Sequence, residues 1–200
     1  MASQNRERPI TAAIILLFLL AILKPIHADI AFAAAFLYQI YVPGILGYSI
    51  RILPGAIRAD LLRMLWVSAS SLTLFAIGQY LLLKPISFEP AFSINLLWGF
   101  AINLLMIALP EEIFYRGFLQ SRLLRVYRPI TAVLLVNLFF ALGHFAGEYS
   151  LIRLLPFFPG LVFSWLVYKS NGSLLGATLY HALCNVFGEW LAESFRWSHG

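Results

Sequence analysis

Two adjacent glutamates and a nearby arginine stand in a part of the chain that is otherwise apolar. Glu111, Glu112 and Arg116 follow the uncharged run NLLWGFAINLLMI, and a charge near hydrocarbon is rarely found without a partner or a function. Residues four apart share a helix face, so Glu112 and Arg116 can pair, whereas Glu111 points about 100° away and stays free. This spacing predicts one carboxylate held by arginine and one presented to a site. The alternative is a salt-bridge cluster where the helix leaves the membrane.

Two later apolar segments carry histidines and an asparagine. His144 ends the sequence FALGH, and a lone histidine on an apolar helix is either a packed, hydrogen-bonded residue or a functional one. His181 and Asn185 lie four apart in HALCN and share a helix face. This pair can hold a helix–helix contact or donate hydrogen bonds to an oxyanion. Glu148 and Glu189 continue the two faces, and we interpret them as polar residues at the ends of their segments.

Together these side chains supply the parts of a peptide hydrolase. Hydrolysis needs a general base, either a carboxylate or a histidine tuned by burial, and donors aimed at the developing oxyanion. Glu111, His144, His181 and Asn185 provide both kinds of group. No serine or cysteine stands in a recognisable nucleophile motif, and Cys184 points off the His181 face as a small packing residue. The pattern therefore indicates an activated water as the nucleophile.

The three motifs resemble those of the CAAX-protease and bacteriocin-processing (CPBP, or Abi) family of intramembrane proteases. EEIFYRG at 111–117 is similar to the E-E-x-x-x-R motif of that family, FALGH at 140–144 to F-x-x-x-H, and HALCN at 181–185 to H-x-x-x-N. They occur in the order of the family, on successive apolar segments. The resemblance covers Met106 to Phe187, whereas the first 90 residues show only hydrophobicity.

The resemblance implies a multi-pass helical endopeptidase that cuts a membrane-associated protein or peptide. Members trim CAAX-type proteins, process bacteriocin leaders or confer immunity to bacteriocins, or cut C-terminal sorting signals. The roles carried over by position are these: Glu111 and His144 activate the water, His181 and Asn185 form the oxyanion hole, and Glu112 and Arg116 are the supporting ion pair.

The same family has been described both as metalloproteases and as glutamic proteases. A catalytic zinc site needs three protein ligands and an open position, which Glu111, His144 and His181 could supply. However, the sequence has no H-E-x-x-H motif, and His181 is paired by spacing with an asparagine rather than with a ligand carboxylate. We therefore favour a site without a metal or other cofactor.

The composition points to a membrane protein. Of the 200 residues, 61% are hydrophobic and only 12% are charged, which is more apolar surface than a soluble domain of this size could bury. The net charge of +5 is scattered between apolar runs rather than gathered on a polar face, so it indicates lipid headgroups and not nucleic acid. The single cysteine excludes a disulfide framework and a Cys-rich zinc site.

The apolar runs predict an all-α, polytopic membrane bundle. Stretches of ~20 residues, separated by charges, Pro or Gly, give about seven spans, within a range of six to eight. The expected spans are 9–27, 30–50, 64–83, 91–110 or beyond, 129–146, 153–169 and 173–193. Pro156 and Pro159 interrupt the sixth. Without a repeat or a linker, we expect one membrane domain over 1–200, with its catalytic core at about 91–195.

Lys and Arg are distributed unequally between alternate loops. One set of loops holds ten: Arg6, Arg8, Arg51, Arg58, Arg63, Arg116, Arg122, Arg125, Arg128 and Lys169. The other set holds four: Lys24, Lys84, Arg153 and Arg196. The positive-inside rule predicts a cell-membrane protein with a cytoplasmic N-terminus. The basic, apolar start with its IHA sequence also fits a signal peptide, but the apolar spans that follow at once favour a membrane helix.

Two other functions fit parts of this pattern. Intramembrane Glu and His also build the relays of proton-coupled transporters, although the chain lacks an internal repeat with broken helices in matching halves. A non-catalytic member of the family, acting in immunity or as a scaffold, would share the fold. The complete set of polar motif residues favours the protease over both.

Overall fold

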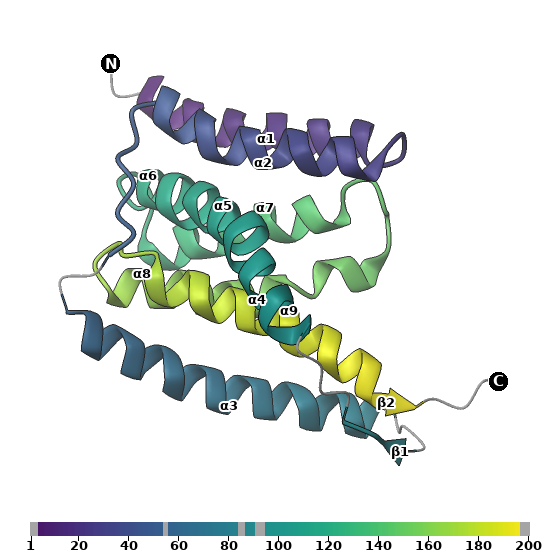
Figure 1. Ribbon diagram of the computed structural model, residues 1–200. Coiled ribbons are helices and arrows are strands. Elements are labelled where there is room, and N and C mark those ends of the chain that lie inside the picture. Colours follow the sequence, from purple (N-terminus) through teal and green to yellow (C-terminus); the bar gives the residue numbers. More distant parts are fainter. Residues whose placement is uncertain (1–3, 54–55, 84–86, 91–94, 197–200) are drawn as a thin grey trace.

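The computed structural model describes residues 4–53, 56–83, 87–90 and 95–196, and these are almost entirely helical (Figure 1). The expected all-α membrane bundle is confirmed. The helices outside the central segment are α1 (Gln4–Leu23), α2 (Ala28–Ile45), α3 (Ile57–Leu83), α7 (Pro129–Phe145), α8 (Phe157–Lys169) and α9 (Leu175–Ser194). Two short strands, β1 (Ser87–Phe88) and β2 (Phe195–Arg196), pair antiparallel beside the end of α9.

The central segment is one long helix that changes its winding along its length. It runs through α4 (Asn95–Ile102), η1 (Asn103–Ala108), α5 (Leu109–Glu111), η2 (Glu112–Gln120) and α6 (Ser121–Leu123). Both η1 and η2 are π-helical, a winding that is rare and often found at functional sites. Pro110 contributes to the change because it has no N–H to donate to the carbonyl four residues earlier. The second π-helical stretch begins at Glu112, and all nine of its residues are buried.

Four helical segments are long and apolar enough to cross a membrane: Ala28–Ile45, Ile57–Gly78, Leu96–Leu123 and Leu151–Lys169. Two more apolar helices, Arg8–Leu23 and Pro129–Phe145, are shorter. The chain is therefore a multi-pass membrane protein, and the count of about seven spans stays a prediction. Large exposed hydrophobics such as Phe18, Trp66 and Trp98 are suited to contact with lipid.

The expected interruption of the sixth span lies at its start. Residues Leu151–Leu154 form a short 3₁₀ turn, η3, and α8 begins only at Phe157. Pro156 is the N-cap of α8 and Pro159 stands in its first turn, where a missing N–H removes no intrahelical hydrogen bond. The expected span 153–169 is therefore a turn followed by an intact helix.

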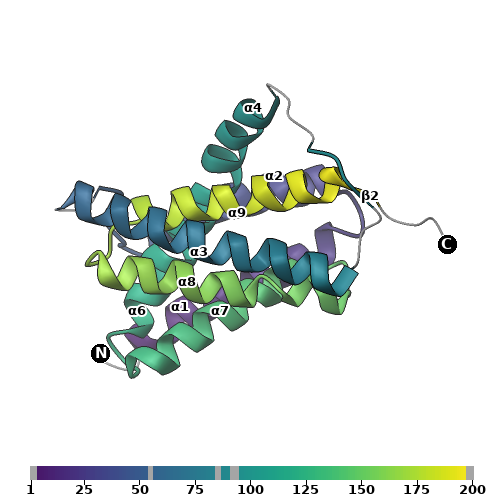
Figure 2. The ribbon, with the colours of Figure 1, turned by 90° about the horizontal axis from the view of Figure 1, so that it is seen from below.

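The motif-bearing helices lie in the middle of the bundle. α8 packs against both α7 and α9, and η1 and η2 contact α9 and α7 respectively. α1 and α2 pack together on one side of this group and α3 lies on the other, beside α9 (Figure 1). Seen from below, α4 leans away from the remaining helices (Figure 2). This arrangement brings the segments that carry the three motifs, far apart in sequence, to one place inside the protein.

Candidate active site

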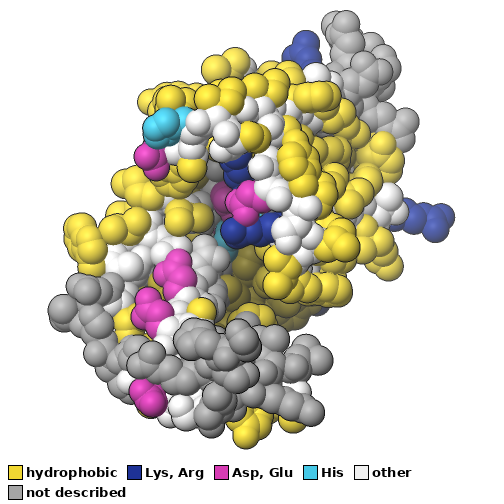
Figure 3. All heavy atoms as spheres, turned by 90° about the vertical axis from the view of Figure 1, so that its right-hand side faces the viewer, with side chains coloured by type: hydrophobic (Ala, Val, Ile, Leu, Met, Phe, Trp, Pro, Cys, Tyr) yellow, Lys and Arg dark blue, Asp and Glu magenta, His cyan; other side chains and the backbone are white. Residues whose placement is uncertain are grey.

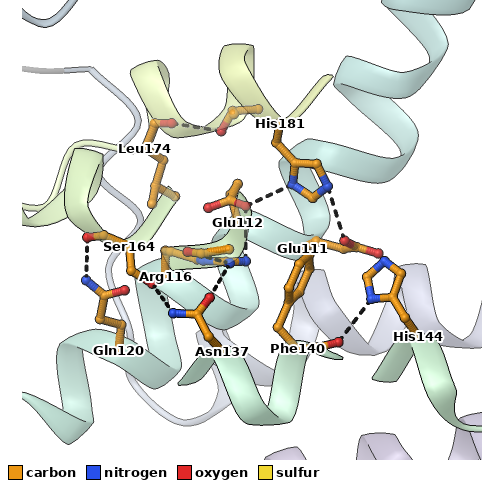
Figure 4. A network of polar contacts seen from close by, with 12 residues as sticks. Glu111, Glu112, Arg116, Gln120, Asn137, Phe140, His144, Ser164, Leu174 and His181 are labelled. Atoms are coloured by element: carbon orange, nitrogen blue, oxygen red, sulfur yellow. Dashed lines mark hydrogen bonds and ion pairs between the residues drawn. The ribbon is translucent and has the colours of Figure 1, made fainter. Parts of the chain in front are cut away.

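Glu112 lies at the centre of a buried polar network (Figure 4). Its Oε1 atom accepts a hydrogen bond from Arg116 Nη1 at 3.2 Å and another from His181 Nδ1 at 2.9 Å. The side chains of Glu112 and Arg116 are both 0% exposed. The predicted i,i+4 ion pair is therefore present, and both of its side chains are enclosed by the protein. Arg116, counted above with the loop residues, belongs to the interior.

Arg116 is fixed from several directions. Its Nη2 atom donates to Asn137 Oδ1 at 3.0 Å and to the carbonyl oxygen of Gly160 at 3.2 Å. The guanidinium also lies 4.2 Å from the centre of the Phe140 ring and 5.0 Å from that of Phe163. Hydrogen bonds to charged groups and cation–π contacts both strengthen when water is excluded. These contacts hold the arginine, and through it the Glu112 carboxylate, in one position.

Three residues that the motifs do not contain complete the network. Asn137 Nδ2 donates to Ser164 Oγ at 2.9 Å, and Gln120 Nε2 donates to the Ser164 carbonyl at 3.0 Å. Asn137 and Ser164 are both 0% exposed, so η2, α7 and α8 are joined by polar contacts in the interior. In the sequence, these three residues are visible only as polar side chains within apolar runs. That pattern does not indicate which helices they join.

Glu111 differs from its neighbour in having no tight partner. Its Oε2 atom lies 3.6 Å from His181 Nε2 and makes no hydrogen bond with the described residues, although the atom itself is buried. The side chain is 19% exposed, against 0% for Glu112. The predicted division between a held and a free carboxylate therefore agrees with the geometry. A buried carboxylate oxygen without a donor is suited to accept a proton or to bind water.

His181 stands between the two glutamates. Because the Glu112 oxygen can only accept, the Nδ1–H of His181 donates to it, which leaves Nε2 directed at Glu111. The ring stacks on Phe163, with 4.5 Å between centroids and 17° between planes. Hydrogen bond and stacking together fix the orientation of the ring. This contact between Glu112 and His181 was not predicted from the sequence.

His144 has its ring orientation set by the backbone. Its Nδ1–H donates to the carbonyl oxygen of Phe140 at 3.0 Å, one turn earlier on α7. The other nitrogen, Nε2, then carries a lone pair when the ring is neutral. In Figure 4 the carboxylate of Glu111 lies between the rings of His144 and His181. Glu111 and His144 thus present an acceptor oxygen and an acceptor nitrogen to the same space.

That space is a cavity of about 600 Å³, lined by residues that include Glu111 and His144. Such a volume is typical of a site for a small ligand or a few residues of peptide. Most of the wall is apolar, with Phe32, Phe36 and Met106 among the lining residues. Lys24, Glu148 and Arg153 also line the cavity. Figure 3 shows basic and acidic side chains gathered on this side of the molecule, among hydrophobic ones.

Among the described residues, Asn185 makes no hydrogen bond or ion pair with the other motif residues. It lies one turn beyond His181 on α9 and is half-buried. Among the described residues that line the cavity, neither Asn185 nor His181 is included. The structure therefore brings four motif residues into direct contact: Glu111, Glu112, Arg116 and His181. His144 is connected to them through the cavity that it shares with Glu111. The role of Asn185 stays a prediction.

The described side chains were compared with the geometry that a metal site requires. Within the described residues, no group of three or more His, Cys, Asp and Glu side chains is placed to hold a metal ion. Glu111 and His144 line the cavity, whereas His181 does not, and the Nδ1–H of His181 donates to Glu112. We derive no step through zinc from this geometry.

Comparison with protein families gives a match over the second half of the chain. Residues 93–187 match the family of type II CAAX prenyl endopeptidase Rce1-like proteins. This segment of the chain is similar to the Rce1-like family. The matched residues contain all three motifs, so the resemblance inferred from those motifs is confirmed. Comparison with curated proteins and with solved structures found no match. The match to the Rce1-like family supports a CAAX-type intramembrane protease that acts on a membrane-associated protein.

Proposed function

We propose that this protein is an intramembrane endopeptidase that hydrolyses a peptide bond with water activated by Glu111 and His144. The observation that carries the proposal is the partly exposed Glu111 carboxylate, whose Oε2 makes no hydrogen bond with the described residues and which shares a cavity with the His144 ring. Burial of this kind in an otherwise apolar protein is costly unless the group has a task. The Rce1-like match supports the same class of reaction.

In the proposed reaction, a water molecule in the cavity gives a proton to Glu111 while its oxygen attacks the carbonyl carbon of the scissile bond. His144 Nε2 accepts the second hydrogen of that water as a hydrogen bond and so orients the oxygen. The resulting tetrahedral intermediate collapses when the proton on Glu111 passes to the leaving amine. The C–N bond then breaks, and a carboxylic acid and an amine are released with the glutamate restored.

His181 and Asn185 are proposed as donors to the oxyanion of that intermediate. With its Nδ1–H committed to Glu112, His181 can donate through Nε2 only when the ring is protonated. Asn185 follows on the same face of α9 and would supply the neutral donor. In this scheme Glu112 and Arg116 position His181 and do not take part in proton transfer.

We further propose that the enzyme works without a metal, as a glutamic protease. Dialysis of the purified protein against a strong chelator is then expected to leave the cleavage rate unchanged, and elemental analysis should find less than one zinc per chain. A cleavage rate that falls on chelation and returns with added zinc would reverse this assignment.

The proposed substrate is a membrane-associated protein or peptide, either CAAX-type, a bacteriocin leader or a C-terminal sorting signal. We place the enzyme in the cell membrane with its N-terminus in the cytoplasm, as the distribution of Lys and Arg suggests. The direct test compares the membrane proteomes of cells that carry the wild type and the Glu111→Gln variant. We expect uncut precursors to accumulate in the variant.

The purified variant gives the matching measurement. Glu111→Gln keeps the size of the side chain and should lower the cleavage rate of any precursor identified in this way by ~10²–10⁴-fold. Its melting temperature should stay close to that of the wild type, because Glu111 makes no hydrogen bond with the described residues. Wild-type activity in folded Glu111→Gln would remove Glu111 as the base.

A further inference from the structure

One face of α2 lines the cavity that holds Glu111 and His144. The α2 residues on this face are Ala28, Phe32, Ala35, Phe36 and Gln39. Their spacing is that of a single helix face. Burial increases along it, because Phe32 is 49% exposed, Ala35 8% and Gln39 6%. Gln39 is therefore the innermost residue of this face, about 16 Å along the helix from Ala28 at 1.5 Å per residue.

The side-chain amide of Gln39 makes no hydrogen bond with the part of the chain that the structure describes. Its nitrogen and oxygen are not among the enclosed polar atoms of those residues, so the amide faces the open space of the cavity. The surrounding run, IAFAAAFLYQIYV, holds no other amide side chain. A polar group that leaves water without gaining a hydrogen bond destabilises the folded protein. The position of Gln39 in this apolar run therefore points to a partner that enters the cavity.

Gln39 lies on the helix that packs against the proposed base. α2 contacts both α5, which ends at Glu111, and η2, which follows it. The ring of Tyr38, next to Gln39 in the chain, lies 5.8 Å from the ring of Phe114, three residues after Glu111. A ligand in contact with the Gln39 amide is thus in the part of the cavity where α2 meets the central helix.

The other hydrogen-bond donors of the cavity wall are mostly occupied. Among the described lining residues, Lys24 and Arg153 pair with Glu148, and the Nδ1–H of His144 donates to the backbone. The uncharged donors that remain in this part of the wall are the Gln39 amide and the Tyr115 hydroxyl.

A peptide segment inside such a cavity needs partners for its main chain. A segment that is extended for cleavage has lost the hydrogen bonds of a helix, and each unpaired peptide group in apolar surroundings costs free energy. A glutamine amide presents an acceptor oxygen and a donor nitrogen side by side. It can therefore pair with a peptide N–H and a peptide C=O at once, whatever side chains the segment carries.

We propose that Gln39 binds the main chain of the substrate in an extended conformation. Its Oε1 atom accepts a hydrogen bond from a peptide N–H, and its Nε2 atom donates to a peptide C=O of the same segment. This inference rests on the proposed function only in stating that the bound segment contains the scissile bond. Gln39 then selects an extended peptide and not a particular side chain.

Binding can be measured without cleavage, in the Glu111→Gln protein held in phosphatidylcholine nanodiscs. The probes are dansyl-hexaleucine amide and the oligoester with the same side chains, in which oxygen replaces every internal peptide N–H. Because all of these donors are replaced, no shift of the probe along the cavity can restore the hydrogen bond to Gln39. The measured quantity is the ratio of the two dissociation constants, ester over peptide. Comparing this ratio between variants cancels the partition of each probe into lipid.

Gln39→Met, introduced beside Glu111→Gln, removes the amide and keeps an unbranched side chain of similar length. It should lower the ester-to-peptide ratio by about 2- to 12-fold, the net effect of one hydrogen bond. The matched control is Phe36→Met, also beside Glu111→Gln, which changes the same face of α2 in the same cavity. It should weaken both probes alike and leave the ratio unchanged.

Melting temperatures separate substrate binding from a structural role. Gln39→Met should be at least as stable as its parent, because it removes an amide without a partner among the described residues. Gln120→Met is the comparison, since Gln120 donates to the Ser164 carbonyl at 3.0 Å and joins η2 to α8. That variant should melt at a lower temperature.

The results distinguish this inference from the proposed function. An ester-to-peptide ratio that Gln39→Met leaves unchanged, or no measurable binding of hexaleucine amide, overturns the role of Gln39, even where uncut precursors accumulate in cells with Glu111→Gln. A ratio that depends on Gln39 in a protein that cleaves no cellular precursor contradicts the proposed function and leaves the binding inference intact. With an identified precursor and Glu111 present, Gln39→Met should raise KM by a similar factor with kcat unchanged, because the bond is made in the ground state and the transition state alike.

Discussion

At the scale of single residues, the site depends on the different surroundings of two neighbouring glutamates. Glu112 is enclosed and accepts hydrogen bonds from both Arg116 and His181 through one oxygen, whereas Glu111 is partly exposed and lines the cavity. The i,i+4 spacing predicted the ion pair, because that contact is local in a helix. It could not predict that the same carboxylate also fixes a histidine 69 residues later. Such a contact depends on how α9 packs against the central helix.

Replacing Glu112 should mainly harm stability. Glu112→Ala leaves Arg116 as a buried charge without its carboxylate, which costs about 3–5 kcal/mol in the free energy of unfolding. We expect a clearly lower melting temperature and a lower yield from membranes, with slower cleavage because His181 loses its partner. The matched control is Asp60→Ala, which breaks the more exposed pair of Asp60 with Arg63 and should cost less than about 1 kcal/mol. Equal losses in the two variants would contradict the central role of Glu112.

Asn185 gives a test of the oxyanion hole. If its amide donates to the oxyanion, Asn185→Ala removes an interaction made only in the transition state and should lower kcat by ~10²–10³ with KM nearly unchanged. Asn185→Asp should be at least as slow, because an ionised carboxylate repels the developing negative charge. Single-turnover rate and melting temperature are measured on one preparation. A normal rate in folded Asn185→Ala would assign this side chain to helix packing.

At the scale of elements, the motifs predicted which helices carry the site but not what joins them. Arg116 contacts Asn137 and Gly160, which are 21 and 44 residues away. Neither residue stands in a motif, and no local spacing connects them to Arg116. The π-helical winding from Glu112 was also not predicted, because it depends on the tertiary contacts that fill its wider turns. Sequence periodicity determines which face of a helix is polar, whereas packing determines which partners that face meets.

Gly160 is the position where two of these elements approach most closely. A Cβ at this residue would overlap Asn137 Oδ1 and lie 2.9 Å from Arg116 Nη2. Gly160→Ala is therefore expected to separate α8 from the arginine and to destabilise the protein by about 1–3 kcal/mol, with a loss of cleavage through Glu112 and His181. The comparison is Gly99→Ala in α4, where a Cβ meets no atom within 4 Å. That variant should be as stable as the wild type or slightly more stable.

At the scale of the whole molecule, the basic residues separate the two ends of the bundle. Arg51 donates to the carbonyl oxygen of Asn171, and Arg122 donates to those of Leu46 and Gly47, so three chain connections meet at one end. Lys24, Glu148 and Arg153 meet at the other end. Arg51 and Arg122 thus lie at one end and Lys24 and Arg153 at the other, as the grouping of loops predicts, whereas Arg116 is buried and Lys84 lies outside the described residues. Hydropathy and charge could predict which residues lie at each end of the bundle, because both properties determine how a helix is placed along the membrane normal.

The cavity opens at the end of the bundle with fewer basic residues. This position predicts the side of the membrane that the cavity faces. With the positive-inside rule, the Arg125 end faces the cytoplasm and the Arg153 end, with the cavity, faces the opposite side. The test uses a Cys184→Ala background and single cysteines at two exposed positions, Arg125→Cys and Arg153→Cys. A membrane-impermeant maleimide added to intact cells should label only Arg153→Cys. Labelling of Arg125→Cys alone would place the cavity on the cytoplasmic side, and the candidate substrates would then be those presented from the cytoplasm.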